Sequence, residues 1–125
     1  MKDFAIELTD RPGELGRVVT ALSRYSVNLK AVTGLAINHH VLVRIIADDP
    51  DAARSALQQA GIRYIEEEVV QVLLENRAGE LAAVTTKLAE ARVNLRAIYM
   101  TGIVDNLVEL AIVTDDAKKA KRMLE

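Results

Sequence analysis

The chain has 125 residues, of which half are hydrophobic, and its 16 Lys and Arg against 18 Asp and Glu give a net charge of −2. This near balance excludes the basic field that holds nucleic acid, and the absence of Trp with only one Phe removes the stacking platforms for single-stranded bases. Cysteine is absent, which excludes disulfides and thiolate chemistry. No apolar run approaches the roughly 20 residues that cross a bilayer, so we expect a globular cytoplasmic protein without a membrane segment.

The first half of the chain predicts strand, helix, strand, strand, helix, strand. Strands are indicated by alternation of apolar and polar residues or by β-branched runs, and helices by apolar residues at helical spacing. Pro50 is flanked by Asp49 and Asp51, either of which can cap the second helix, and Gly61 ends it. The predicted elements are the strand 3–8, the helix 15–22, the strands 28–37 and 41–46 joined as a hairpin around "NHH", the helix 51–60 and the strand 62–67.

The second half of the chain repeats the first. "DRPGEL" at 10–15 returns as "NRAGEL" at 76–81, and "VNLKAV" at 27–32 returns as "VNLRAI" at 93–98, both displaced by 66 residues. From the hairpin onward the displacement is 67, where "VLVRIIADD" at 41–49 lies over "VELAIVTDD" at 108–116, within "LVELAIVTDD". Internal repetition of this kind predicts two homologous units, which we place at residues 1–67 and 68–125.

The element order βαββαβ, found twice, predicts an α+β protein with two tandem ferredoxin-like units. In each unit an antiparallel sheet would carry both helices on one face. The second unit ends in the helical segment "KKAKRMLE" and lacks its last strand. Either the chain continues further, or a neighbouring chain covers the open edge of that sheet.

A glycine-bearing loop precedes the first helix of each unit. Backbone N–H groups at a helix N-terminus are unpaired and attract a carboxylate or phosphate. Gly13 and Gly79 let a ligand approach the backbone closely, and Asp10 and Asn76 can accept hydrogen bonds from a ligand ammonium. The alternative is structural, since Asp and Asn are also preferred helix caps.

Asn28 and Asn94 begin the second strand of each unit, where an amide is unusual because asparagine is depleted in strands. Two interpretations stay open. The repeated amide can contact a small zwitterion together with the repeated helix N-terminus, or it can form an Asx turn that closes the connection from helix to strand.

At these positions the chain resembles the ACT domain family, small regulatory modules that bind amino acids beside metabolic enzymes. "DRPGELGRVVTALSRYSVNLKAV" carries the family's loop, helix and strand signature, and "NRAGELAAVTTKLAEARVNLRAI" carries it with Ala78 in place of the proline. The resemblance implies units paired side by side, with an amino acid held at their interface by the loop and by the Asn of the second strand. It places the ligand-binding residues at Asp10, Pro12, Gly13, Leu15, Asn28 and Leu29, and at Asn76, Ala78, Gly79, Leu81, Asn94 and Leu95.

The sequence departs from one form of this signature. Some serine-binding members carry a histidine two residues before the loop Asn, where this chain has Leu8 and Leu74, which argues against serine. The leucines around the loops favour an apolar amino acid instead. Arg11 and Arg77 also match the motif, and we interpret them as solvated side chains rather than ligand contacts.

We find no catalytic or metal-binding pattern and expect no cofactor. His39 and His40 are adjacent in a turn and make a poor metal pair, and Asp48, Asp49 and Asp51 lack calcium-loop spacing. The hypothesis is therefore a non-enzymatic amino-acid-sensing regulatory module, homodimeric, acting on a regulated enzyme or regulator. The alternatives are a ligand-free protein-interaction scaffold and an acylphosphatase-like hydrolase that would use Arg11 and Asn28.

Overall fold

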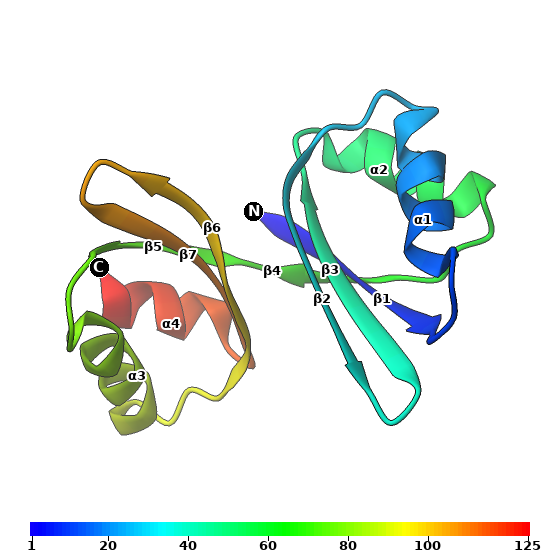
Figure 1. The fold of residues 1–125 in the computed structure, drawn as a ribbon. Helices are drawn as coiled ribbons and strands as arrows, with labels where there is room; N and C mark the ends of the chain where they lie inside the picture. Colours follow the sequence, from blue (N-terminus) through cyan, green and yellow to red (C-terminus); the bar gives the residue numbers. More distant parts are fainter. The chain divides into compact units, whose positions relative to one another are not determined.

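A computed structural model describes residues 1–125, and the chain divides into two compact units. One unit comprises Lys2–Glu67, and the other comprises Glu68–Glu125 together with Met1. Each unit is a sheet with two helices, as Figure 1 shows. No helix has the length and apolar character that crossing a membrane requires.

The first unit has the predicted βαββαβ order and a four-stranded sheet. The sheet order is β2-β3-β1-β4, and β3 is antiparallel to both of its neighbours. This is the expected ferredoxin-like arrangement. The elements are β1 Lys2–Thr9, α1 Glu14–Ser23, β2 Leu29–Ile37, β3 His40–Ala47, α2 Pro50–Gln59 and β4 Ile65–Glu68.

The strand expected at 62–67 begins three residues later because its first residue belongs to the end of α2. Gly61 has a positive φ of 68°, and the Ile62 N–H donates to the Leu57 carbonyl at 2.9 Å. This bond, from the residue after the glycine back into the last turn, is the Schellman way of ending a helix. Ile62 is therefore buried under the helix, and pairing starts only at Ile65.

The core of the first unit lies between one face of the sheet and both helices. Alternate residues of β1 and β3 point into it, because successive side chains of a strand face opposite ways. The helices contribute residues spaced three or four apart, as the helical period requires. Fourteen buried residues form this cluster: Phe4, Ile6, Leu8, Val18, Ala21, Leu22, Val27, Val43, Ile45, Ala47, Ala53, Ala56, Leu57 and Ile62.

The second unit repeats this arrangement up to its last helix. Its sheet has three strands in the order β5-β7-β6, and β5 has no strand on its other side. The corresponding core has six buried residues: Val70, Val84, Leu88, Val93, Ile112 and Ala120. The elements are β5 Val70–Glu75, α3 Glu80–Glu90, β6 Leu95–Val104, β7 Leu107–Thr114 and α4 Ala117–Leu124.

The last helix of each unit is capped by an aspartate. The Asp49 side chain accepts a hydrogen bond from the Ala52 N–H, with Pro50 in the first turn, and the Asp116 side chain accepts one from the Lys119 N–H. Of the two caps considered for α2, Asp49 is therefore the one used.

Candidate functional site

The glycine of each echoed loop is itself the N-cap of the following helix. Gly13 and Gly79 have φ values of 87° and 91°, in the left-handed region that favours glycine, and no side chain caps α1 or α3. The alternative in which Asp10 and Asn76 cap these helices is therefore wrong. Both side chains are exposed, and neither makes a hydrogen bond.

Most first-turn backbone amides of α1 and α3 face no acceptor within the protein; the Glu80 N–H, which donates to the Arg77 carbonyl at 3.4 Å, is the exception. The N–H groups of Arg17 and Ala83 make the first helical bonds, to the Gly13 and Gly79 carbonyls respectively. The preceding N–H groups of Leu15 and Gly16 make no hydrogen bond. Because the helix dipole is positive at this end, these amides are suited to an anion such as a carboxylate.

The repeated arginine of the motif pairs with the repeated glutamate. Arg77 Nε donates to Glu80 Oε1 at 2.7 Å, and its Nη2 lies 2.9 Å from Glu75 Oε2. These contacts raise the pKa of Arg77, with the hydrogen bond to Glu80 as the largest cause. In the first unit, Arg11 Nη2 lies 3.7 Å from Glu14 Oε2. The Arg and Glu of "R-x-G-E" therefore pair with each other at the start of each helix.

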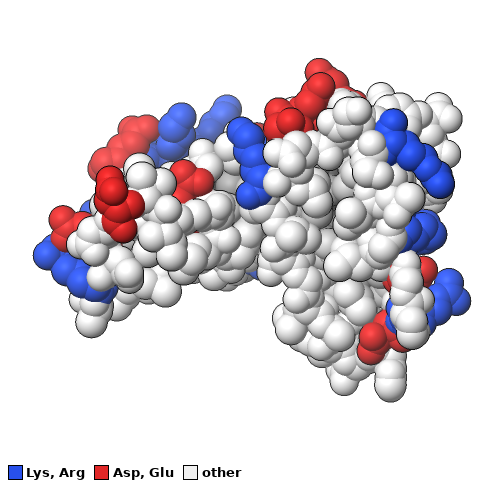
Figure 2. Space-filling model, turned by 45° about the horizontal axis from the view of Figure 1, so that its top comes forward, with Lys and Arg blue, Asp and Glu red and all other residues white.

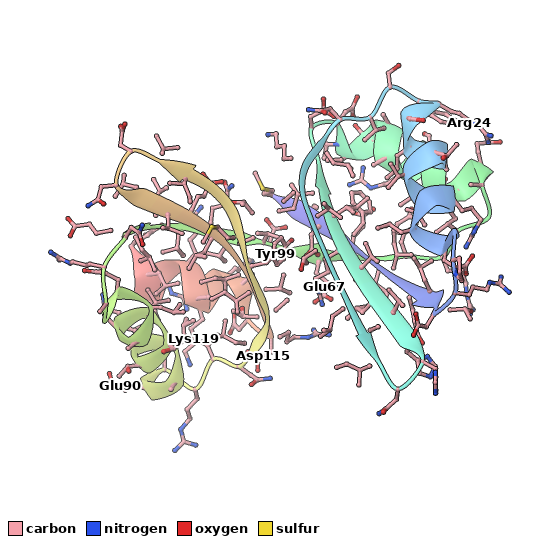
Figure 3. The ribbon with its side chains drawn as sticks, viewed as in Figure 1. Arg24, Glu67, Glu90, Tyr99, Asp115 and Lys119 are labelled. Atoms are coloured by element: carbon pink, nitrogen blue, oxygen red, sulfur yellow. The ribbon has the colours of Figure 1, made fainter.

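The backbone groups of Asn28 and Asn94 each make two hydrogen bonds to an aspartate, an arrangement called here the aspartate clasp. The Asn28 N–H donates to Asp48 Oδ1 at 3.1 Å, and the Asp48 N–H donates to the Asn28 carbonyl at 2.9 Å. Asn94 and Asp115 make the same two bonds at 2.9 and 3.1 Å, and Figure 3 shows Asp115 near the start of β6. The aspartates close this connection, so the Asx turn is not what the asparagines form. Their carboxamides are exposed and make no hydrogen bond.

The two aspartates were missed as part of the site. Sequence reasoning considered Asp48 only as a possible cation ligand, although the doublet Asp48-Asp49 returns as Asp115-Asp116 at the repeat displacement of 67. The first aspartate of each doublet clasps the asparagine and the second caps the helix. The repetition of both residues was the available signal.

Within one unit, the loop and the asparagine lie at opposite ends of the sheet (Figure 1). The loop follows Thr9, which pairs with His40 at one end of β3, whereas Leu29 pairs with Ala47 at its other end. The seven residue steps from His40 to Ala47 span about 23 Å at ~3.3 Å per residue. In the second unit, Glu75 pairs with Leu107 and Leu95 with Thr114, again seven steps.

This separation decides which residues act together. A free amino acid is far shorter than the span, so the predicted loop residues and the predicted Asn of one unit cannot contact the same molecule. The same separation argues against an acylphosphatase-like site within one unit. Such a site would need Arg11 and Asn28 together, but Arg11 lies at the loop end of the sheet and Asn28 at the opposite end. Arg11 is further engaged with Glu14.

The remaining predicted residues divide between the same two ends. Pro12 and Ala78 are exposed in the loops, and Leu15 and Leu81, in the first turns of α1 and α3, are 44% and 48% exposed. Leu29 and Leu95 are half-buried and follow the asparagines. The loop end of each unit therefore offers free amides beside an exposed apolar side chain.

The titratable groups show no arrangement typical of a metal centre. No group of three or more His, Cys, Asp and Glu side chains is placed to hold a metal ion. His40 Nδ1 lies 3.0 Å from Glu7 Oε1, both exposed. On the face drawn in Figure 2, basic and acidic side chains lie in small mixed groups.

The chain matches the ACT domain pair family over residues 1–125. Among solved structures, protein BT0572 from Bacteroides thetaiotaomicron is 26% identical with a TM-score of 0.87, covering 98% of this chain and 85% of that one. The ligand-free regulatory subunit of aspartate kinase from Thermus thermophilus is 16% identical with a TM-score of 0.68, covering 98% and 88%. Aspartate kinase from Clostridium acetobutylicum, described as an allosteric enzyme, is 18% identical with a TM-score of 0.61, covering 98% of this chain and 32% of that one.

A search of curated proteins finds no match. The two structures under 25% identity share the fold with this chain. The family match extends over the whole chain and agrees with the two repeats, the sheet order and the paired glycine loops. The protein therefore belongs to the ACT domain pair family.

Proposed function

We propose that this ACT domain pair senses a free amino acid, which binds between the glycine loop of one unit and the second-strand asparagine of another. The observation that carries the proposal is the span of about 23 Å between these two elements within a unit, at ~3.3 Å per strand residue. Residues that are repeated together but lie at opposite ends can act on one small ligand only when two units adjoin. The two units can be the halves of one chain or belong to two copies in a homodimer.

The chemistry of each element suits one part of a zwitterion. The free amides of Leu15 and Gly16 accept the ligand carboxylate in the positive field of α1. The exposed carboxamide oxygen of an asparagine from the adjoining unit accepts the ammonium, assisted at the first loop by the Asp10 carboxylate. Leu15, which is 44% exposed, covers an apolar side chain of the ligand.

The two loops differ in charge. Asp10 carries a carboxylate where the second loop has the neutral Asn76. A carboxylate attracts an ammonium more strongly than an amide does, since charge-assisted hydrogen bonds are roughly twice as strong as neutral ones. We therefore expect the first loop to bind the amino acid more tightly than the second.

Binding at a junction gives the module a regulatory rather than a catalytic role. A ligand held between two units stabilises the arrangement in which both contact it, and it shifts the population by its difference in affinity between arrangements. A regulated enzyme or regulator reads that shift. The fold shared with a regulatory subunit of aspartate kinase supports this role.

Calorimetric titration of the full chain with each of the twenty amino acids tests the proposal. We expect an apolar amino acid to bind, and Asn28→Ala and Asn94→Ala each to remove one class of site. Gln59→Ala is the matched control, because Gln59 is also an exposed amide that makes no hydrogen bond. Failure of all twenty to bind, or equal affinity in the Asn variants and the control, would contradict the proposal.

Double variants reveal which units share a site. If the first loop works with the second unit's asparagine, Asp10→Ala with Asn94→Ala disables a single site and leaves the other intact. Asp10→Ala with Asn28→Ala then disables both. If instead like units of two copies adjoin, the outcomes exchange, and the measured stoichiometry separates the two arrangements.

A further inference from the structure

Gly16, in the first turn of α1, has neither of the usual structural reasons for a glycine. Its φ is not in the left-handed region, unlike that of Gly13, and a Cβ added at Gly16 would meet no atom within 4 Å. Glycine is one of the poorest helix formers, and it is favoured where another group must come close to the backbone. The group that needs this space must therefore come from outside the unit.

Two exposed apolar side chains flank Gly16. Leu15 precedes it and Val19 lies one turn later, and they are 44% and 40% exposed. Residues four apart lie on one face of a helix, and a helical side chain leans over the turn before it. Leu15 and Val19 therefore form an apolar strip that ends at the free N–H groups of Leu15 and Gly16. A carboxylate bound to these amides brings the rest of the ligand to the strip.

The second unit presents a different surface at the same place. The residues 66 positions later are Leu81, Ala82 and Thr85. Leu81 is 48% exposed, much like its counterpart, but Thr85 is half-buried and its hydroxyl donates to the Leu81 and Ala82 carbonyls at 3.1 and 3.0 Å. The Ala82 methyl group lies only two bonds from the amide nitrogen, so a ligand on that N–H must lie close to it. The second unit therefore has less room and less apolar surface beside its free amides.

We propose that Gly16 and Val19 make the first loop select an amino acid with a large aliphatic side chain, such as leucine, whereas Ala82 and Thr85 restrict the second loop to a small one, such as alanine. Apolar surface covered by Val19 favours the larger ligand at the first loop, and crowding at the Ala82 methyl group disfavours it at the second. The assignment rests on the proposed function, because it names the ligand class of the same two loops.

Calorimetric titration of the full chain with leucine and with alanine tests the assignment. We expect leucine to saturate one site per chain and alanine two. Gly16→Ala should weaken leucine binding about tenfold, the scale on which one methyl group decides in an apolar pocket, and should leave alanine binding unchanged. Thermal unfolding without ligand checks that this variant has lost no stability, so that a weaker affinity reports the site.

The reciprocal change is made in the second unit. Ala82→Gly combined with Thr85→Val gives the second loop the residues of the first, and we expect this double variant to bind leucine at two sites per chain. Gln59→Ala, an exposed residue of α2, is again the control and should alter neither affinity.

The outcomes separate this assignment from the proposed function. An unchanged ratio of leucine to alanine affinity in Gly16→Ala would overturn the assignment and leave amino-acid sensing standing. Leucine bound at two sites of the wild-type chain, or a charged amino acid preferred over both ligands, would do the same. Absence of binding by all twenty amino acids would overturn the proposed function and the assignment with it.

Discussion

The two halves of this chain agree in their backbone devices and differ where the fourth strand lies. Both begin their first helix at a glycine with positive φ, both clasp an asparagine with an aspartate, and both cap their last helix with the next aspartate. In the first half, β4 lies against the outer edge of β1, whereas no strand lies against the outer edge of β5. The buried core cluster has fourteen residues in the first half and six in the second. The devices that shape the loops and the helix ends are thus common to both halves.

The side of the sheet away from the helices has diverged as well. In the first half, Arg44 lies between Asp3 and Glu67, with N–O distances of 3.2 Å to each carboxylate. The equivalent positions of Asp3 and Arg44 are Val69 and Ala111 in the second half. Because Glu67 belongs to β4, the fourth strand completes this ionic group as well as the sheet. The first half therefore uses β4 both in its sheet and in this ionic group.

Truncating equivalent leucines of the last helices tests this difference most strongly. Leu57 is fully buried, whereas Leu124, 67 positions later, is only half-buried. We expect Leu57→Ala to destabilise the first half by about 2–5 kcal/mol, the usual cost of a buried leucine, and Leu124→Ala to cost the second half about 1 kcal/mol. Hydrogen exchange resolved by unit is the measurement, since two units need not unfold together.

Leu22→Ala and Leu88→Ala form the control pair. Both leucines are 1% exposed and equivalent by the repeat, so their losses should be similar. Equal losses at Leu57 and Leu124 would mean that the edge of the second sheet is covered in solution, for example by a second copy.

Two glycines of the first loop and helix should respond in opposite directions. Gly13→Ala forces a side chain onto a φ of 87° and should destabilise by about 1–2 kcal/mol, whereas Gly16 lies in α1 with open space where a side chain would be added. Gly16→Ala should stabilise by up to about 1 kcal/mol, because alanine is the better helix former. The second half already has Ala82 at this position.

Thermal or urea unfolding of the two variants measures these effects, and Gly79→Ala should match Gly13→Ala, since its φ is 91°. Destabilisation by Gly16→Ala would indicate that another unit packs closely against this turn. That result would itself bear on the proposed ligand site, because Gly16 supplies one of the free amides.

Much of the fold was predictable because local chemistry and the repeat agreed. The strands, the helices, the hairpins and the cap at Asp49 follow from patterns that act within a few residues. The predicted start of β4 was wrong. Ile62 has the apolar, β-branched character of a strand residue, but its N–H closes the C-terminal end of α2. Such a helix end depends on the positive φ of Gly61, which composition alone leaves open.

The candidate site was predictable in its residues but not in its geometry. Matching segments identified the loops and the asparagines, and a sequence gives no distance between the two ends of a strand pair. The strand register supplies this distance. Because Thr9 pairs with His40 and Leu29 pairs with Ala47, the loop and the asparagine lie at opposite ends of the sheet. The clasp by Asp48 was missed because its partner is a backbone group twenty residues away.

The smallest expected difference between the halves is in their response to acid. The hydrogen bond from Arg54 is the largest cause that lowers the pKa of Glu66 below its ordinary value of 4.5, whereas Lys121, the residue 67 positions after Arg54, makes no ion pair. A carboxylate whose pKa is lower in the folded state stabilises fully above its unfolded pKa, and this contribution is lost as pH falls toward the folded value. The Arg54–Glu66 pair should therefore stabilise the first half at neutral pH, and this contribution should shrink as pH falls below 4.5 toward the lower pKa of the folded state.

Comparison of wild type with Glu66→Gln by unit-resolved hydrogen exchange, corrected for the intrinsic rate at each pH, measures this contribution. The stability difference in the first half should be largest above about pH 5 and should shrink as Glu66 becomes protonated, while the second half stays unchanged. Glu90→Gln is the control, because Glu90 is an exposed carboxylate on α3 without a partner, as labelled in Figure 3. A difference that persists undiminished at about pH 3 would show that Glu66 supports β4 through packing rather than charge.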